Sequence, residues 1–330
     1  MAGTHEHADG LPGVEPTTPF GHRVLPPPLT GLRLPVVAAP MFLVSNPDLV
    51  LACCRAGIVG SFPALNVRTT EGLDDWLGTI TDQLAPDDAP YAVNLIVHSS
   101  NRRVRDDLAV LARHRVPIVI TSLGTASEVV EAVHGWGGVV WHDVTNERHA
   151  RKAAAAGVDG LILVAAGAGG HAGDTSPFAL VASVRPWFDG LVLLAGAIST
   201  GADVLAARAM GADLAYLGTR FVATRESGAD AAYKRMVVEA GRHDILYTAS
   251  VSTIPANFLR ASLAAAGLDP DAPAGPVDLG HVTNPTESDA KAWRDIWSAG
   301  HGVAAIDDVP TVADLVRRLE AEYHAAKERM

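Results

Sequence analysis

The sequence predicts an α/β protein, a closed (β/α)₈ TIM barrel with an appended C-terminal cap segment. Within residues 31–240, eight short runs of Val, Ile, Leu and Ala are each followed by a helical pattern. The runs are continuously apolar rather than alternating, which is typical of parallel strands covered on both faces. Eight even repeats without a longer crossover favour a closed barrel over an open doubly wound sheet.

The predicted strands come at regular intervals, each before its helix. The strands are expected at residues 34–41, 57–63, 91–97, 117–124, 138–144, 160–166, 191–198 and 214–221. The first helix is expected to begin near residue 46, and the others are expected at 70–84, 101–115, 127–134, 146–156, 176–187, 202–210 and 229–240. Asn46 and Pro47 suit the cap and the first turn of the first helix.

The chain outside the barrel region 31–240 divides into a tail, a cap and a final helix. Residues 1–30 are rich in Pro, Gly and His without an apolar period, which predicts a disordered or loosely attached tail. Residues 241–309 contain several prolines and helical patches near 255–266 and 288–298. We expect a cap or lid there, with a structural flap or a dimer contact as the alternative. Residues 310–330 predict an amphipathic helix packed on the barrel.

Composition limits the classes of partner and compartment. The net charge of −11 and the absence of a basic run argue against a nucleic-acid partner. No apolar stretch is long enough to span a membrane, and the N-terminus does not resemble a signal peptide. The adjacent Cys53 and Cys54 lie in an apolar helical pattern, which favours buried thiols over a disulfide. We therefore expect a cytoplasmic protein that acts on a small molecule, and a homodimer is allowed for.

The stretch 160–173, GLILVAAGAGGHAG, passes from a buried apolar run into four glycines and one histidine, His171. Glycine permits close approach of a ligand to the backbone. A histidine ordinarily titrates near neutral pH and can move a proton. We interpret the stretch as a strand that opens into an active-site loop. The alternative is a structural turn in which the histidine has no chemical role.

The active site of such a barrel lies at the C-terminal ends of its strands. The polar residues and glycines predicted there are Asn94, Thr121, Ser122, His142, Asp143, Gly169, Gly170, His171, Gly196, Gly201, Gly218, Thr219 and Arg220. The turns LAGAISTG and LGTRF follow strands seven and eight, where backbone N–H groups and helix N-termini commonly hold a phosphate. They predict a phosphate-bearing ligand. Thr219 could add a hydroxyl, and Arg220 could add a charge or form a structural ion pair.

Several of these segments together resemble the nitronate monooxygenases, formerly called 2-nitropropane dioxygenases. They are GAGGHAG, LAGAISTG, ADLAYLGTRFVAT, AAPM at 38–41, Asn94, YKRMVVEA and WSAGHG. The similarity runs from about residue 30 to the C-terminus. The resemblance implies an FMN-dependent (β/α)₈ enzyme that oxidises alkyl nitronates or nitroalkanes with molecular oxygen.

The resemblance also implies roles for particular residues. His171 would be the catalytic base, taking the α-proton of a nitroalkane or holding the nitronate. The implied FMN-binding residues are Ala39, Pro40, Met41, Asn94, His142, Gly169, Gly170, Gly196, Ala197, Gly218 and Thr219. Of these, Gly196, Ala197, Gly218 and Thr219 would hold the phosphate. No metal site is expected. The chain departs from many relatives in lacking an acid shortly before the GGH, where it has Gly167 and Ala168.

Two other functions fit the same residues. One is an FMN-dependent reductase of the enoyl-acyl-carrier-protein reductase type, which shares the GGH loop and would consume NAD(P)H. The other is a flavin-binding protein without turnover. Reduction of the bound flavin by substrate would distinguish either enzyme from a flavin-binding protein without turnover.

Overall fold

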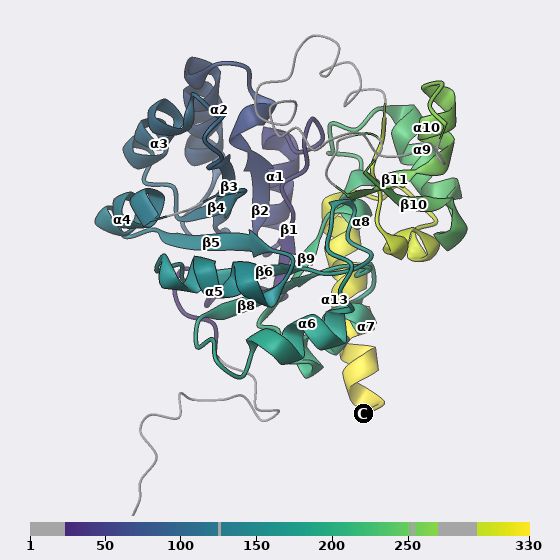
Figure 1. Cartoon of the computed structure of the whole chain (residues 1–330). Helices are drawn as coiled ribbons and strands as arrows, with labels where there is room; N and C mark the ends of the chain where they lie inside the picture. Colours follow the sequence, from purple (N-terminus) through teal and green to yellow (C-terminus); the bar gives the residue numbers. More distant parts are fainter. Residues whose placement is uncertain (1–23, 125–126, 250, 252–254, 270–295) are drawn as a thin grey trace, which may run out of the picture.

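The computed structural model describes residues 24–124, 127–249, 251, 255–269 and 296–330. Its centre is a sheet of eight parallel strands in the order β1-β9-β8-β6-β5-β4-β3-β2, and a parallel bridge between Val37 and Val59 closes it between β1 and β2 (Figure 1). The strands are β1 Val36–Ala38, β2 Gly60–Pro63, β3 Tyr91–Ile96, β4 Ile118–Ser122, β5 Val139–Val144, β6 Gly160–Val164, β8 Leu191–Ala195 and β9 Leu214–Leu217. The predicted barrel is confirmed.

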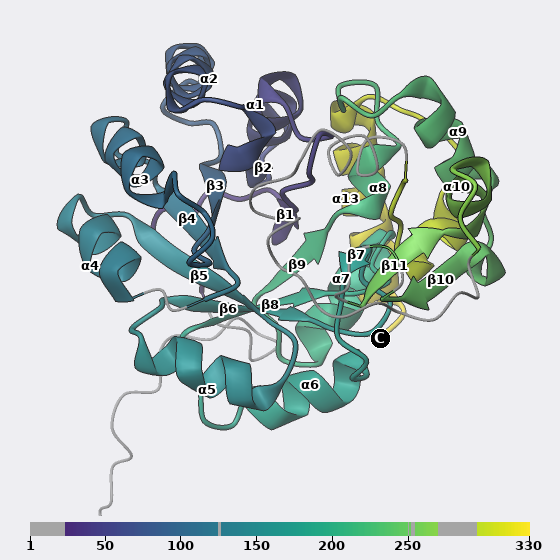
Figure 2. The ribbon, with the colours of Figure 1, turned by 45° about the horizontal axis from the view of Figure 1, so that its top comes forward.

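Helices surround the strands on the outside (Figure 2). They are α1 Pro47–Arg55, α2 Thr70–Gln83, α3 Val104–Arg113, α4 Ser127–Gly135, α5 Glu147–Ala155, α6 Pro177–Val184, α7 Gly201–Ala209 and α13 Val312–Glu328. The short helix α8 Thr219–Val222 follows β9, and α9 Ala231–Glu239 packs with residues of α8 in a separate apolar cluster. Asn46 caps α1 by accepting from the Leu49 N–H at 2.8 Å, as predicted. α13 packs against α7 and α1. Within the described ranges, no helix is both long and apolar enough to cross a membrane.

The strands separate two apolar layers, one inside the barrel and one between strands and helices. Ile120, Trp141 and Ile162 belong to the inner layer, and Val140 and Leu161 to the outer one. Successive side chains of a strand point to opposite faces, so each strand contributes to both layers. This alternation decides which polar residues face the barrel interior.

A second sheet stands beside the barrel and differs from the sequence-based expectation. Its antiparallel strands are β7 Gly170–His171, β11 Ala256–Leu259 and β10 Ile245–Thr248, in the order β10-β11-β7. The expected loop around His171 is therefore a short strand. The helix expected at 255–266 is a strand followed by α10 Arg260–Ala265, because a short apolar run fits either state until a partner strand is present.

The eighth strand, the two cysteines and the predicted tail can each be compared with the structure. β9 ends at Leu217, and α8 begins at Thr219, so the eighth strand is shorter than predicted. Cys53 and Cys54 are buried and free, as predicted, and burial raises the pKa of Cys54 to about 12. Leu29, placed in the predicted tail, is 1% exposed and packs in the inner layer. Residues 1–23, and residues 288–295 of the second helical patch, lie outside the described part of the chain.

Candidate active site

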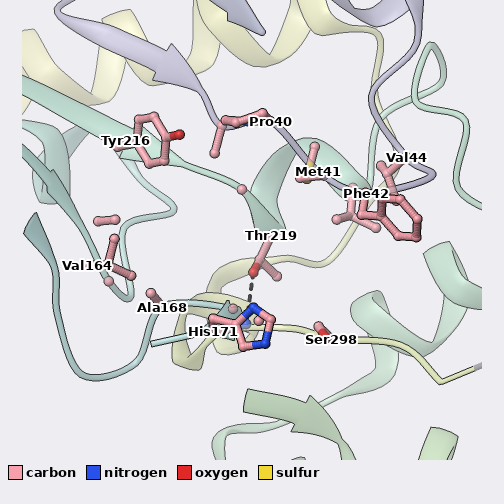
Figure 3. Close-up of a pocket in the computed structure, with 18 of the residues that line it drawn as sticks. Pro40, Met41, Phe42, Val44, Val164, Ala168, His171, Tyr216, Thr219 and Ser298 are labelled. Atoms are coloured by element: carbon pink, nitrogen blue, oxygen red, sulfur yellow. Dashed lines mark hydrogen bonds between the residues drawn. The ribbon is translucent and has the colours of Figure 1, made fainter. Parts of the chain in front are cut away.

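A cavity of about 340 Å³ opens at the C-terminal ends of the barrel strands (Figure 3). Its volume lies within the range of roughly 300–1,000 Å³ usual for small-molecule sites. The predicted site residues that line it are Ala39, Pro40, Met41, Asn94, Gly169, Gly170, His171, Gly196, Ala197, Gly218 and Thr219. Ile296, Trp297, Ser298, Gly300 and Gly302 complete it from the segment after the second sheet.

His142 lies outside this cavity, contrary to its predicted place near the flavin. On β5 the neighbouring Trp141 fills the inner layer and Asp143 lines the cavity, so His142 between them faces the helices. Its Nδ1 lies 2.7 Å from Thr121 Oγ1. Burial, with His149 and other positive charge nearby, lowers the pKa of His142 to about 4. The next residue, Asp143, is the one that lines the cavity, because a shift of one residue along a strand exchanges the two faces.

His171 lies in the wall of the cavity on β7, which is held from outside by β11. His171 is paired with Ala256, and Asn257 Nδ2 donates to the Ala168 carbonyl at 2.7 Å. The Tyr247 hydroxyl donates to the Ala172 carbonyl at 3.0 Å. Asn257 and Tyr247 were not predicted, because nothing in the local sequence links them to a loop over 70 residues earlier.

The imidazole of His171 is a weaker base than its sequence context suggested. Burial lowers the pKa of His171 to about 4, since the apolar surroundings disfavour the charged form. The ring is therefore neutral at neutral pH and able to accept a proton. The sequence alone indicated a histidine that titrates near neutral pH, whereas burial lowers the pKa of His171 well below that range.

The turns after β8 and β9 offer hydrogen-bond donors to the cavity. The N–H groups of Gly196, Ile198, Gly218 and Thr219 donate to no acceptor in the described part of the chain. The buried Ser199 hydroxyl, which the sequence analysis missed, also has no partner there. Gly196 and Ala197 have positive φ angles of 136° and 56°. The glycine at 196 suits that backbone, whereas Ala197 adopts a conformation uncommon for a residue with a side chain.

Thr219 and Arg220 differ in what they contribute to this wall. The Thr219 hydroxyl accepts from the Gly300 N–H at 2.9 Å and keeps its own proton to donate (Figure 3). Arg220 is 2% exposed and forms an ion pair with Asp308 at 2.9 Å. Of the two roles considered for Arg220, the structure therefore shows the structural ion pair.

The N-terminus of α7, expected to help hold a phosphate, is already bonded to acids of the chain. Asp203 Oδ2 accepts from the N–H groups of Ser199 and Thr200 at 3.0 and 2.9 Å. Glu322 Oε2, from α13, accepts from the Gly201 N–H at 2.7 Å. Among the described residues, no lysine or arginine lines the cavity. An anion bound here would be held by backbone N–H groups and hydroxyls instead.

The wall formed by β3, β4 and β5 carries a hydrogen-bonded polar row. Asn94 Nδ2 donates to Ser122 Oγ at 2.8 Å, and Ser122 Oγ donates to Asp143 Oδ2 at 2.5 Å. Burial raises the pKa of Asp143 to about 6. Burial and the nearby Asp143 raise the pKa of Tyr216, which enters the cavity from β9.

The fold and the site define a class: a (β/α)₈-barrel enzyme that takes a small ligand at the C-terminal ends of its strands. The family model for nitronate monooxygenase matches residues 99–322, and the chain belongs to this family. It is accordingly an oxidoreductase.

The chain is also similar to individual relatives and solved structures. The chain is 30% identical to a nitronate monooxygenase of Paraburkholderia phytofirmans, over 92% of this chain and 96% of that one. A nitroalkane oxidase structure from Streptomyces ansochromogenes is 28% identical, with a TM-score of 0.76 over 91% of this chain and 98% of that one. A FabK variant from Thermotoga maritima is 25% identical, with a TM-score of 0.76 over 91% of this chain and 96% of that one.

Proposed function

We propose that the chain oxidises alkyl nitronates or nitroalkanes with molecular oxygen, using FMN as cofactor and His171 as base. The observation that carries the proposal is that one cavity is lined both by a neutral histidine and by a cluster of uncommitted backbone N–H groups. The first can accept a proton from a substrate. The second can hold the phosphate of a cofactor.

The residues present fit FMN. A Cβ built on Gly218 meets no atom closer than 3.8 Å and is bordered by Ala39 and Met41, so this glycine leaves room at the cavity wall. The Ser199 hydroxyl, which has no hydrogen-bond partner among the described residues, supplies a further donor in the cavity lining. Gly196, Ala197, Gly218, Thr219 and Ser199 would hold the phosphate, and Ala39, Pro40, Met41, Asn94, Gly169 and Gly170 would contact the rest of the cofactor. FMN supplies the redox chemistry, and the protein binds and orients it.

The role of His171 follows from its protonation state and its support. β11 fixes the β7 backbone from one side, which holds the imidazole in the cavity wall. The neutral ring would accept the α-proton of a nitroalkane. Because a base with a pKa of about 4 provides little driving force for that transfer, we expect nitronates, already deprotonated, to react faster. Five residues of the proposed cap segment, 241–309, line the cavity and would cover the bound ligand: Ile296, Trp297, Ser298, Gly300 and Gly302.

An anaerobic spectral titration tests the proposal. The purified protein is mixed with a nitronate in one cuvette and with NADPH in another, and the visible flavin bands are followed. Bleaching by nitronate alone supports the proposed function. Bleaching by NADPH alone favours the enoyl-reductase type of activity. A protein that neither contains FMN nor binds added FMN overturns the proposal.

A further inference from the structure

One acidic side chain faces the cavity, on the inner side of β5. Within the described residues, Asp143 is the only carboxyl group that lines the cavity. No cation of the described residues pairs with it, whereas Asp213 and Asp308 pair with Arg185 and Arg220. In the described part of the chain Asp143 therefore has no structural ion pair to explain it, and its position in the cavity indicates contact with a bound ligand.

The hydrogen bonds that reach Asp143 have a fixed direction. Asn94 Nδ2 lies 3.3 Å from the Ile120 carbonyl oxygen, which can only accept, so this end of the amide carries the hydrogens. The same Nδ2 donates to Ser122 Oγ, and the single Ser122 proton is left for Asp143 Oδ2. Oδ2 is consequently an acceptor. A proton on Asp143 must sit on Oδ1.

Asp143 Oδ1 is buried and accepts no hydrogen bond from the described residues. The groups that face the acid from the neighbouring strands are Ser122 on β4, the Tyr216 phenol on β9 and the apolar Ile162 on β6, which is paired with Asp143. None is cationic, and burial already raises the pKa of Asp143 to about 6. A buried, unpaired carboxylate is costly, so burial shifts Asp143 toward the neutral acid, which predominates below about pH 6 and carries its proton on Oδ1.

The position of the acid matches the far end of the proposed cofactor. In the closed strand order β5, which carries Asp143, lies opposite β1 and three strands from β9, and the turns after β8 and β9 carry the uncommitted N–H groups. A ligand with its phosphate at one wall extends its ring toward the other. We propose that Asp143 is a ligand-binding residue which, as the neutral acid aligned by Ser122, donates from Oδ1 to a carbonyl or ring-nitrogen acceptor of bound FMN. The identity of the ligand rests on the proposed function.

The test compares FMN affinity of the wild type and Asp143→Asn between pH 5 and pH 8. Asparagine retains a neutral donor but cannot ionise. The ratio of wild-type to variant Kd should stay nearly constant up to about pH 6 and then rise, to roughly 100-fold at pH 8, because only the neutral fraction of Asp143 is competent. Titration of the FMN phosphate affects both proteins equally and cancels. His171, with its pKa of about 4, stays neutral throughout.

A matched control and a variant-free measurement complete the experiment. Asp159→Asn removes a carboxyl from the opposite end of the barrel, where it accepts from the Val140 N–H, and should leave the wild-type pH profile unchanged. In calorimetric titrations of the wild type with FMN at pH 7.5, in buffers of different ionisation enthalpy, binding should take up close to one proton. The FMN phosphate, with a pKa of about 6, is mostly ionised at that pH.

The outcomes separate the two proposals. FMN binding with a pH-independent Kd ratio, or without proton uptake, overturns the role of Asp143 and leaves the cofactor assignment intact. A wild type that binds no FMN overturns the proposed function, and this inference with it. A rising ratio together with proton uptake supports both.

Discussion

The two faces of β5 show how one strand serves stability and ligand binding at once. His142 points outward, contacts Thr121 and is covered by α5. Asp143, the next residue, points inward and lines the cavity. Burial favours the neutral form of both, lowering the pKa of His142 to about 4 and raising that of Asp143 to about 6. A shifted pKa therefore does not by itself identify a site residue.

His171 extends the comparison. Burial lowers the pKa of His171 to about 4, as it does for His142, yet His171 lies in the cavity wall and His142 does not. The two histidines differ in what they face. Substitutions on the cavity side should change ligand binding and turnover, whereas substitutions on the helix side should change stability.

The largest difference is expected between the two histidines in turnover. His171→Ala should lower kcat/KM for a neutral nitroalkane by about 10²–10⁴-fold, the usual contribution of a positioned base, and should retain FMN. The loss for a preformed nitronate should be smaller. His142→Gln should leave kcat/KM for both substrates within about twofold of the wild type per folded enzyme, as measured by oxygen consumption. Equal losses of kcat/KM in His171→Ala and His142→Gln would contradict the assignment of His171 to the cavity side and His142 to the helix side.

Two glycines provide the second test. Gly218 has φ −101°, and the nearest atoms to an added Cβ are 3.8 Å away, so Gly218→Val should fold and fill the phosphate wall. We expect its FMN Kd to rise about 100-fold, roughly 2.7 kcal/mol. A Cβ on Gly60 would lie 2.6 Å from the Val50 carbonyl oxygen. Gly60→Val should cost about 1–3 kcal/mol of stability without changing the affinity of the folded fraction.

The measurements for the glycine pair are fluorescence titration with FMN and urea unfolding. Unchanged FMN affinity in Gly218→Val would remove the β9 turn from the cofactor site. A normal unfolding midpoint in Gly60→Val would mean that the helix-side packing adjusts more easily than the close contact suggests.

The last test concerns the pH dependence of stability. The pKa of His142 is about 4 in the folded chain against 6.5 ordinarily, so the unfolded chain binds more protons between these values. Above about pH 6.5 His142 is neutral in both the folded and the unfolded chain and costs no stability. The free energy of unfolding decreases as the pH falls from 6.5 toward 4, because the unfolded chain is then protonated first. The loss is of the order of 3 kcal/mol, at about 1.36 kcal/mol per pKa unit.

His142→Gln should consequently lose less stability than the wild type between pH 7 and pH 4.5. Urea unfolding at the two pH values measures this difference. Parallel losses in the two proteins would show that the buried imidazole does not account for the acid sensitivity.

The parts of the molecule that depend on neighbours along the chain could be predicted from the amino-acid sequence. Eight continuous apolar runs define the strands, because strands buried on both faces need no polar residues. Asn46 before Pro47 marks a helix start, and the glycines at 169, 170, 196 and 218 mark the turns that line the cavity. In each case the physical cause lies within a few residues.

The direction in which side chains face, and the distant groups that they contact, depend on the folded arrangement of the strands. In VVWHDV both faces of the strand are buried, so the sequence offered no alternation with which to tell His142 from Asp143. The support of His171 comes from β11, 85 residues later. The carboxylate of Glu322 accepts a hydrogen bond from the Gly201 N–H, 121 residues earlier in the chain. Such contacts are set by closure of the barrel and packing of the second sheet, which no local pattern records.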